Sequence, residues 1–287
     1  LANDSNTGSA AAGVSTMLTA AQAYASVADV LFVDNSNLNV QSTRAGYYLD
    51  MSPLTSSDTS LNVDDFIPGV WQSFQWDNGI WALPVSTDVI ILTYNPAAFD
   101  AVGLAYPNER WTIDDLDNTA RKLAVVDSTG AVTTTGLAVS NNNLEWLFRS
   151  LLGKGFYDAS VTPNTPVLND PTLQTMLTTW ATLVKDGMVS NQGGFGAAET
   201  IPMQIGGSRT LNRRPGNDQN QVTLSASLLP GGAAGLNPQG FAISSGTQYP
   251  EQAYTLIKYL TNNADVANNF FGVSPARQSL VGVSGSN

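Results

Sequence analysis

The sequence predicts an α/β fold in which helices are layered on a sheet. Two apolar runs indicate buried strands: residues 30–33, a continuous run between Asp29 and Asp34, and residues 89–94, which are nearly all apolar. The first is expected to be a parallel strand. Residues 112–123 and 170–187 carry apolar side chains at helical spacing. Strands that alternate with helices are typical of α/β layers.

Length and composition are consistent with one large domain or two modest ones. The chain has 287 residues, of which 43% are hydrophobic and 9% aromatic, so a substantial core is expected. Twelve basic residues against 23 acidic ones give a net charge of −11, which disfavours binding to nucleic acid and to anionic membranes. No apolar stretch reaches the roughly 18 residues that a membrane span needs.

The chain has no histidine and no cysteine. This excludes a Ser-His-Asp triad, a thiolate nucleophile, the usual zinc and haem ligands, and disulfides. The acidic pairs Asp64-Asp65 and Asp114-Asp115 lack calcium-loop spacing, and the glycine-rich stretch 231–240 lacks the ending of a phosphate-binding loop. We therefore predict no metal and no cofactor.

Local signals place the remaining elements in order. A short helix is expected over 14–27, followed by the first strand and a polar loop over 35–39, at the strand end where ligands bind in open α/β sheets. Residues 76–81 carry a hairpin signal. Thr112 with Asp115 forms a capping-box pattern that opens a helix.

The second half continues the alternation. Strands are expected over 136–140, 223–229 and 240–244, and helices from Asp170-Pro171 to Gly187 and over 250–260. Residues 231–235 (Gly-Gly-Ala-Ala-Gly) indicate a flexible connector, which makes them a candidate hinge.

Four groups of segments, in a consistent order along the chain, resemble a known family. They are residues 28–33 with 46–51; 79–84 with 94–99 and 111–116; 201–207; and 240–244 with 251–254 and 274–277. Together they resemble the extracellular solute-binding proteins of ABC transporters, in the carbohydrate-type family that includes the maltose-binding protein.

The resemblance implies a two-lobe periplasmic-binding-protein-like fold of type II, with a ligand cleft between the lobes. Lobe one would comprise residues 1–87 and 238–275, and lobe two residues 91–235, with interlobe crossings at 85–89 and 231–239. Relatives begin with an additional strand–helix–strand unit and continue with further helices. We therefore expect a chain that lacks both, with residues 276–287 starting a truncated C-terminal segment.

The resemblance also implies a location and a partner. The location would be extracellular or periplasmic, with a lipid anchor on a missing N-terminal segment as one form of membrane attachment. The partners would be a small carbohydrate and the permease subunits of an ABC transporter.

Candidate ligand-binding residues lie where lobe one is expected to meet the solute. Asp88 follows Leu83-Pro84 at the position of a polar sugar contact in relatives, and its carboxylate can accept two hydroxyl hydrogen bonds; the alternative is that it holds the crossing backbone. Asn35 and Asn37 can both donate and accept, but asparagine in loops also forms Asx turns. Gln239, at the end of the second crossing, is a further ligand-binding candidate.

The candidates in lobe two are Asn142, Trp146 and Arg209. Asn142 and Trp146 follow the strand that ends at Ser140, and a tryptophan face can stack on a sugar ring. The alternative for Trp146 is core packing, because it belongs to a helical apolar stripe. Arg209 stands where relatives often carry a tryptophan, and it could stack through its guanidinium or bind an acidic sugar. Trp180 lies on another helical stripe and is expected in the core.

The predicted function is capture of a carbohydrate for a permease, without bond making or breaking. The mechanism implied is closure of two lobes around the ligand. One alternative is a glycoside hydrolase or lyase that works with carboxylates, which the 23 acidic residues and the lack of histidine would permit. Another is the same fold with a polyamine, peptide or anion as ligand.

Overall fold

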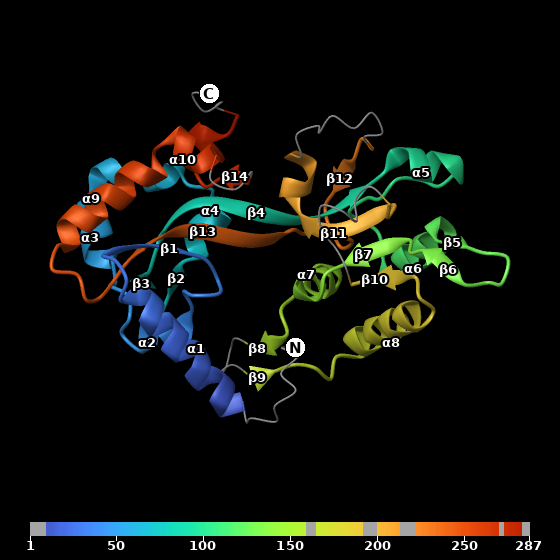
Figure 1. Cartoon of the computed structure of the whole chain (residues 1–287), viewed down its shortest axis with the longest axis horizontal. Coiled ribbons are helices and arrows are strands. Elements are labelled where there is room, and N and C mark those ends of the chain that lie inside the picture. Colours follow the sequence, from blue (N-terminus) through green and yellow to red (C-terminus); the bar gives the residue numbers. More distant parts are fainter. Residues whose placement is uncertain (1–9, 159–164, 192–199, 213–221, 270–272, 283–287) are drawn as a thin grey trace. The chain divides into compact units, whose positions relative to one another are not determined.

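The computed structural model describes residues 10–158, 165–191, 200–212, 222–269 and 273–282 (Figure 1). The chain divides into two compact units. Unit 1 comprises Leu1–Asp88 and Leu236–Asn287, and unit 2 comprises Val89–Gly235. No helix in the described ranges has the length and apolar character of a membrane span.

Unit 1 is assembled from both ends of the chain. Its elements are α1 (Ala10–Ala25), β1 (Val30–Val33), α2 (Val40–Arg44), α3 (Ser52–Ser57), η1 (Thr59–Leu61), η2 (Val63–Asp65), α4 (Pro68–Gln72), β2 (Gln75–Trp76), β3 (Gly79–Ile80), most of β13 (Gly235–Ile243), α9 (Pro250–Thr261), α10 (Ala264–Asn269), β14 (Ser274–Pro275) and η5 (Gln278–Leu280). The strand β4 (Leu83–Tyr94) begins here and continues into unit 2.

Unit 2 is one continuous stretch of chain. Beyond the second half of β4 its elements are α5 (Pro96–Ala101), α6 (Ile113–Leu123), β5 (Val125–Val126), β6 (Val132–Thr134), β7 (Leu137–Val139), α7 (Asn141–Leu152), β8 (Tyr157–Asp158), β9 (Thr165–Pro166), α8 (Pro171–Lys185), β10 (Val189–Ser190), β11 (Met203–Gly207), η4 (Ser208–Asn212) and β12 (Ser225–Ser227).

The strands of the main sheet follow the order β1-β13-β4-β11-β7-β10, with β12 and β14 also paired to β4. The expectation that residues 29–34 form a parallel strand is wrong, because β1 is antiparallel to β13. The apolar run has another cause, since Leu31 and Val33 pack into one core cluster whereas Val30 and Phe32 pack against a second. Burial of both faces removes the alternation of a half-exposed strand, whatever its direction.

Several local predictions are confirmed. Asp77 and Asn78 have φ angles of 53° and 61° and join β2 to β3, as a tight hairpin turn requires. Thr112 and Asp115 form the expected capping box of α6. The Asp170 side chain accepts hydrogen bonds from the Thr172 and Leu173 N–H groups at the start of α8.

The core of unit 2 forms where α6, α7 and α8 cover β4, β7 and β11. Leu92, Leu116, Leu137 and Leu147 are fully buried there. Trp180 packs against this core and lies edge-to-face with Phe148 at 6.0 Å between ring centroids. The prediction of a packing role for Trp180 is therefore confirmed.

Residues 231–235, which the sequence predicts to be a flexible connector, form a turn that packs against α7. A Cβ on Gly231 (φ 93°) would lie 2.2 Å from the Ser150 carbonyl oxygen, and one on Gly235 would lie 2.6 Å from the Trp146 ring. The Ala233 N–H donates to Ser150 Oγ at 3.0 Å. These glycines permit close approach of the chain to α7.

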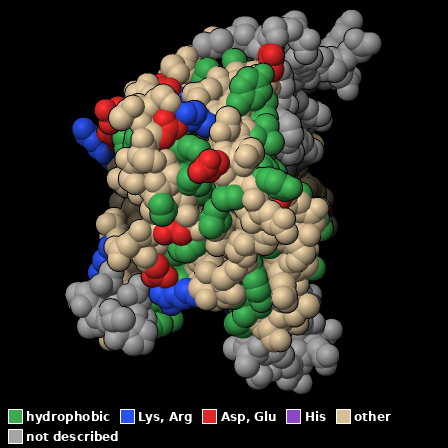
Figure 2. Space-filling model, turned by 90° about the vertical axis from the view of Figure 1, so that its left-hand side faces the viewer, with side chains coloured by type: hydrophobic (Ala, Val, Ile, Leu, Met, Phe, Trp, Pro, Cys, Tyr) green, Lys and Arg blue, Asp and Glu red, His purple; other side chains and the backbone are tan. Residues whose placement is uncertain are grey.

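Charged side chains are sparse on the unit 1 surface in Figure 2, which is mostly uncharged. This agrees with a charged fraction of only 12% in the sequence.

Candidate functional site

The loop that follows β1 is organised by its own side chains. Asn37 Oδ1 accepts from the Asp34 N–H at 3.1 Å, and Asp34 Oδ1 accepts from the Ser36 N–H at 2.8 Å. The Tyr48 hydroxyl donates to the Asn37 carbonyl at 3.0 Å, and burial raises the pKa of Tyr48 to about 12, so this donor keeps its proton. The Asx turn of this loop is thus made by Asp34, while Asn37 holds the loop through its side-chain oxygen and its carbonyl, and Asn35 is exposed.

Asp88 lies on β4, at the residue where the strand leaves unit 1. Its side chain is only 1% exposed. Ser86, two residues earlier on the same strand, is fully buried, and its hydroxyl donates to Gln239 Oε1 on β13 at 3.1 Å. Gln239 itself is half-buried.

The unit 1 candidates come together at one end of its sheet. Val33 pairs with Gly240, so the loop carrying Asn35 begins beside Gln239. Gly240 in turn lies against β4, where a Cβ would approach the Leu83 carbonyl oxygen to 2.7 Å. The position of this loop follows from β-sheet register, although the strand direction was predicted incorrectly.

The unit 2 candidates also share one sheet end. The neighbouring strands β7 and β11 are parallel, α7 begins directly after β7, and η4 directly after β11. Asn143 Nδ2 donates to the Ile205 carbonyl at 3.4 Å, and the Val89 N–H donates to Ser208 Oγ at 3.2 Å. The carboxyl ends of parallel strands are where α/β folds place ligands.

Individual placements in unit 2 differ. Arg209 is exposed on η4. Trp146 is half-buried and packs against the unit 2 core, with Gly235 against its ring and the Arg149 guanidinium 5.1 Å from the ring centroid. The Asn142 side chain lies outside the described part of the structure. These contacts support the packing role that the sequence left open as the alternative for Trp146.

Sequence reasoning missed Ser86 and Ser208. Ser86 could have been found from strand alternation, because residues two apart on β4 share a face with Asp88. Ser208 carried no comparable signal, since its contact with Val89 bridges 119 residues. Within the described residues, no cluster of three acidic side chains has the arrangement of a metal site.

Comparison with known proteins identifies the class. Residues 4–267 match the family of bacterial extracellular solute-binding proteins, and the chain belongs to that family. Members of this family bind solutes, and the family description places them outside the cytoplasm. Comparison with curated protein sequences gave no match.

Solved structures share the two-lobe α/β fold. The ABC transporter solute-binding protein of Thermotoga lettingae bound to α-D-tagatose is 21% identical with a TM-score of 0.73, covering 93% of this chain and 71% of its own. The Agrobacterium radiobacter solute-binding protein in complex with ribitol is 21% identical with a TM-score of 0.71, and the match covers 93% of this chain and 71% of that protein. The maltose/maltodextrin-binding domain of Bdellovibrio bacteriovorus bound to maltotriose is 18% identical with a TM-score of 0.67, and the match covers 93% of this chain and 71% of that domain.

Proposed function

We propose that this chain captures a carbohydrate outside the cytoplasm and delivers it to the permease subunits of an ABC transporter. The observation that carries the proposal is the set of polar groups at one sheet end of each unit, in a chain of the solute-binding family. Neutral amides with a single carboxylate suit hydroxyl groups, which both donate and accept. Structural neighbours with this fold are described with a sugar or sugar alcohol bound.

The proposed contacts come from both units. In unit 1 they are Asn35, Asn37, Asp88 and Gln239, and the hydrogen bonds of Asn37 to Asp34 and Tyr48 hold the loop that carries Asn35. In unit 2 they are Asn142, Arg209 and the accessible part of Trp146. Arg209 is exposed on the 3-10 helix η4, so its guanidinium can stack on a sugar or bind an acidic substituent.

No covalent step is part of this function. A solute that contacts both units favours whichever arrangement of the units makes both sets of contacts, so binding and closure are coupled. We propose β4 and β13 as the hinge, because the boundary between the units falls within or at the end of these strands. Small-angle scattering with and without saturating sugar should give a smaller radius of gyration in the bound form, with unchanged helix content by circular dichroism.

A thermal-shift panel tests the function directly. α-D-Tagatose, ribitol and maltotriose are compared with putrescine and inorganic phosphate, which represent the polyamine and anion alternatives. A ligand present at 100 times its dissociation constant stabilises the folded form by about 2.7 kcal/mol, which gives a clear rise in melting temperature. A shift with putrescine or phosphate, and none with any of the three sugars, would contradict the proposal.

A further inference from the structure

One hydrogen bond fixes the orientation of a candidate ligand-binding amide. Ser86 Oγ, on β4, donates to Gln239 Oε1, on β13, at 3.1 Å. Ser86 is 0% exposed, so its hydroxyl has no competing water, whereas Gln239 is half-buried and reaches solvent. The amide oxygen of Gln239 is thus directed to the interior of unit 1.

The chemistry of the carboxamide then determines what Gln239 presents. A glutamine side chain has one oxygen that accepts and one NH₂ group that donates twice. When Ser86 occupies the oxygen, Gln239 offers N–H donors at its other edge. Asp88 shares the face of Ser86 on β4, about 7 Å further along the strand, and an ionised carboxylate only accepts.

We infer that Ser86 is a positioning residue for ligand binding, which holds Gln239 so that its N–H groups act together with the Asp88 carboxylate on a polyhydroxylated, uncharged ligand. A hydroxyl accepts from the amide and donates to the carboxylate. An ammonium group offers nothing to the amide donors, and a phosphate would meet the Asp88 charge. This inference rests on the proposed function and narrows its ligand class to neutral sugars or sugar alcohols.

The contact itself is tested without any ligand. Urea unfolding is measured for Ser86→Ala, Gln239→Leu and the double variant. Because the two side chains share one hydrogen bond, the double variant should lose less stability than the sum of the single variants. The matched control is Thr93→Val on the same strand, which removes a hydroxyl that is 2% exposed and donates to the Gln204 carbonyl. The stability lost in Thr93→Val should simply add to that lost in Gln239→Leu. If the losses of Ser86→Ala and Gln239→Leu also add in full, the two side chains share no hydrogen bond and the contact is overturned.

The positioning role is tested by titration calorimetry with α-D-tagatose, ribitol and maltotriose. Gln239→Glu keeps an acceptor for Ser86 but removes both N–H donors, so affinity for the sugar bound by the parent should fall roughly tenfold. Ser86→Ala alone should lower the affinity for the sugar severalfold relative to the parent. In a chain that already carries Gln239→Glu, adding Ser86→Ala should lower the affinity no further. Thr93→Val should leave affinity unchanged.

The outcomes separate the two claims. If the parent binds a sugar but Ser86→Ala binds as tightly as the parent, or costs the same in both backgrounds, the positioning role is overturned and the proposed function stands. If the parent binds none of the three sugars, the proposed function and the inference fail together.

Discussion

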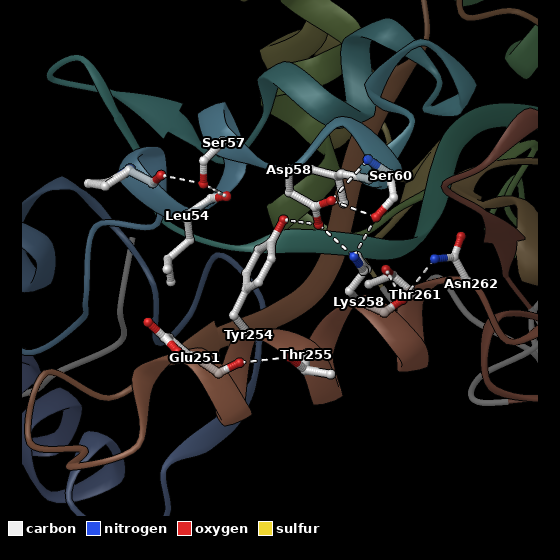
Figure 3. A network of polar contacts seen from close by, with 12 residues as sticks. Leu54, Ser57, Asp58, Ser60, Glu251, Tyr254, Thr255, Lys258, Thr261 and Asn262 are labelled. Atoms are coloured by element: carbon white, nitrogen blue, oxygen red, sulfur yellow. Dashed lines mark hydrogen bonds and ion pairs between the residues drawn. The ribbon is translucent and has the colours of Figure 1, made fainter.

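The polar contacts within unit 1 differ in kind from those within unit 2. In unit 1, Lys258 on α9 contacts Asp58 at 2.6 Å, and Tyr254 donates to the same carboxylate at 3.1 Å (Figure 3). These contacts join stretches of chain about 200 residues apart. In unit 2, Arg121 contacts Asp186 and Lys154 contacts Asp170, so the ion pairs link neighbouring helices at the ends of α8.

The difference follows from connectivity. Unit 1 closes a long loop that contains all of unit 2, and closing long loops costs conformational entropy. The C-terminal stretch returns through β14, which pairs with β4 at Ser86 and Thr87, and through Arg277, which is buried over the Phe66 ring at 3.9 Å. Unit 1 should therefore depend on single long-range contacts more than unit 2 does.

The largest expected effect is that of Arg277→Met. Arg277 is 1% exposed and donates to the Leu61 and Asn62 carbonyls and to Asp65. Its removal takes the charged partner from Asp65, which keeps its hydrogen bonds from Ser279, and one donor from each of the two carbonyls. This should cost about 3–5 kcal/mol of unfolding free energy. In urea, unit 1 should then unfold before unit 2, giving two transitions.

The matched control is Arg44→Met, which breaks the exposed ion pair between Arg44 and Asp77. Exposed pairs contribute little, so this variant should unfold close to the parent. If Arg277→Met were no more destabilising than Arg44→Met, the dependence of unit 1 on its C-terminal stretch would be refuted.

A second comparison concerns two glycines of unit 2. Gly231→Ala combines a left-handed φ of 93° with a Cβ 2.2 Å from a backbone oxygen, so it should cost about 3 kcal/mol. Gly153→Ala has a φ of 65° but open space around the Cβ, so it should cost only about 1 kcal/mol. Thermal or urea unfolding measures both. Equal costs would show that the packing around Gly231 contributes little and would favour the predicted flexible connector at residues 231–235.

These examples show what the sequence could and could not predict. The capping box at Thr112, the hairpin at Asp77 and the helix start at Asp170 depend on neighbours within a few residues. The packing of Gly231 on Ser150 and the antiparallel pairing of β1 with β13 depend on residues about 80 and 210 positions away. In the site, residue types pointed to hydroxyl recognition, and the hydrogen bonds among Asp34, Ser36 and Asn37 are also local, but the burial of Asp88 is set by tertiary contacts.

A smaller effect is expected from pH acting on the unit 1 network in Figure 3. Hydrogen bonds from Lys258 and Ser60 hold the pKa of Asp58 well below its ordinary value of 3.8. A carboxylate whose pKa is lowered on folding adds stability above its unfolded pKa, and loses it as pH falls toward the folded value. Asp58→Asn should therefore melt below the parent at pH 7, with the gap narrowing at about pH 2.5. A gap of constant size over this range would show that the charge contributes nothing.

The most direct measurement of the account is the affinity of Asp88→Asn for the sugar that binds the parent, by titration calorimetry. The substitution keeps the size of the side chain and replaces a charge-assisted hydrogen bond of about 1.5–3 kcal/mol with a neutral one of about 1. Affinity should fall roughly tenfold. Trp180→Phe, which alters a core contact of unit 2, should lower the melting temperature and leave affinity nearly unchanged. If Asp88→Asn instead binds as tightly as the parent while its melting temperature falls, Asp88 only holds the strand, and the proposed site is in the wrong place.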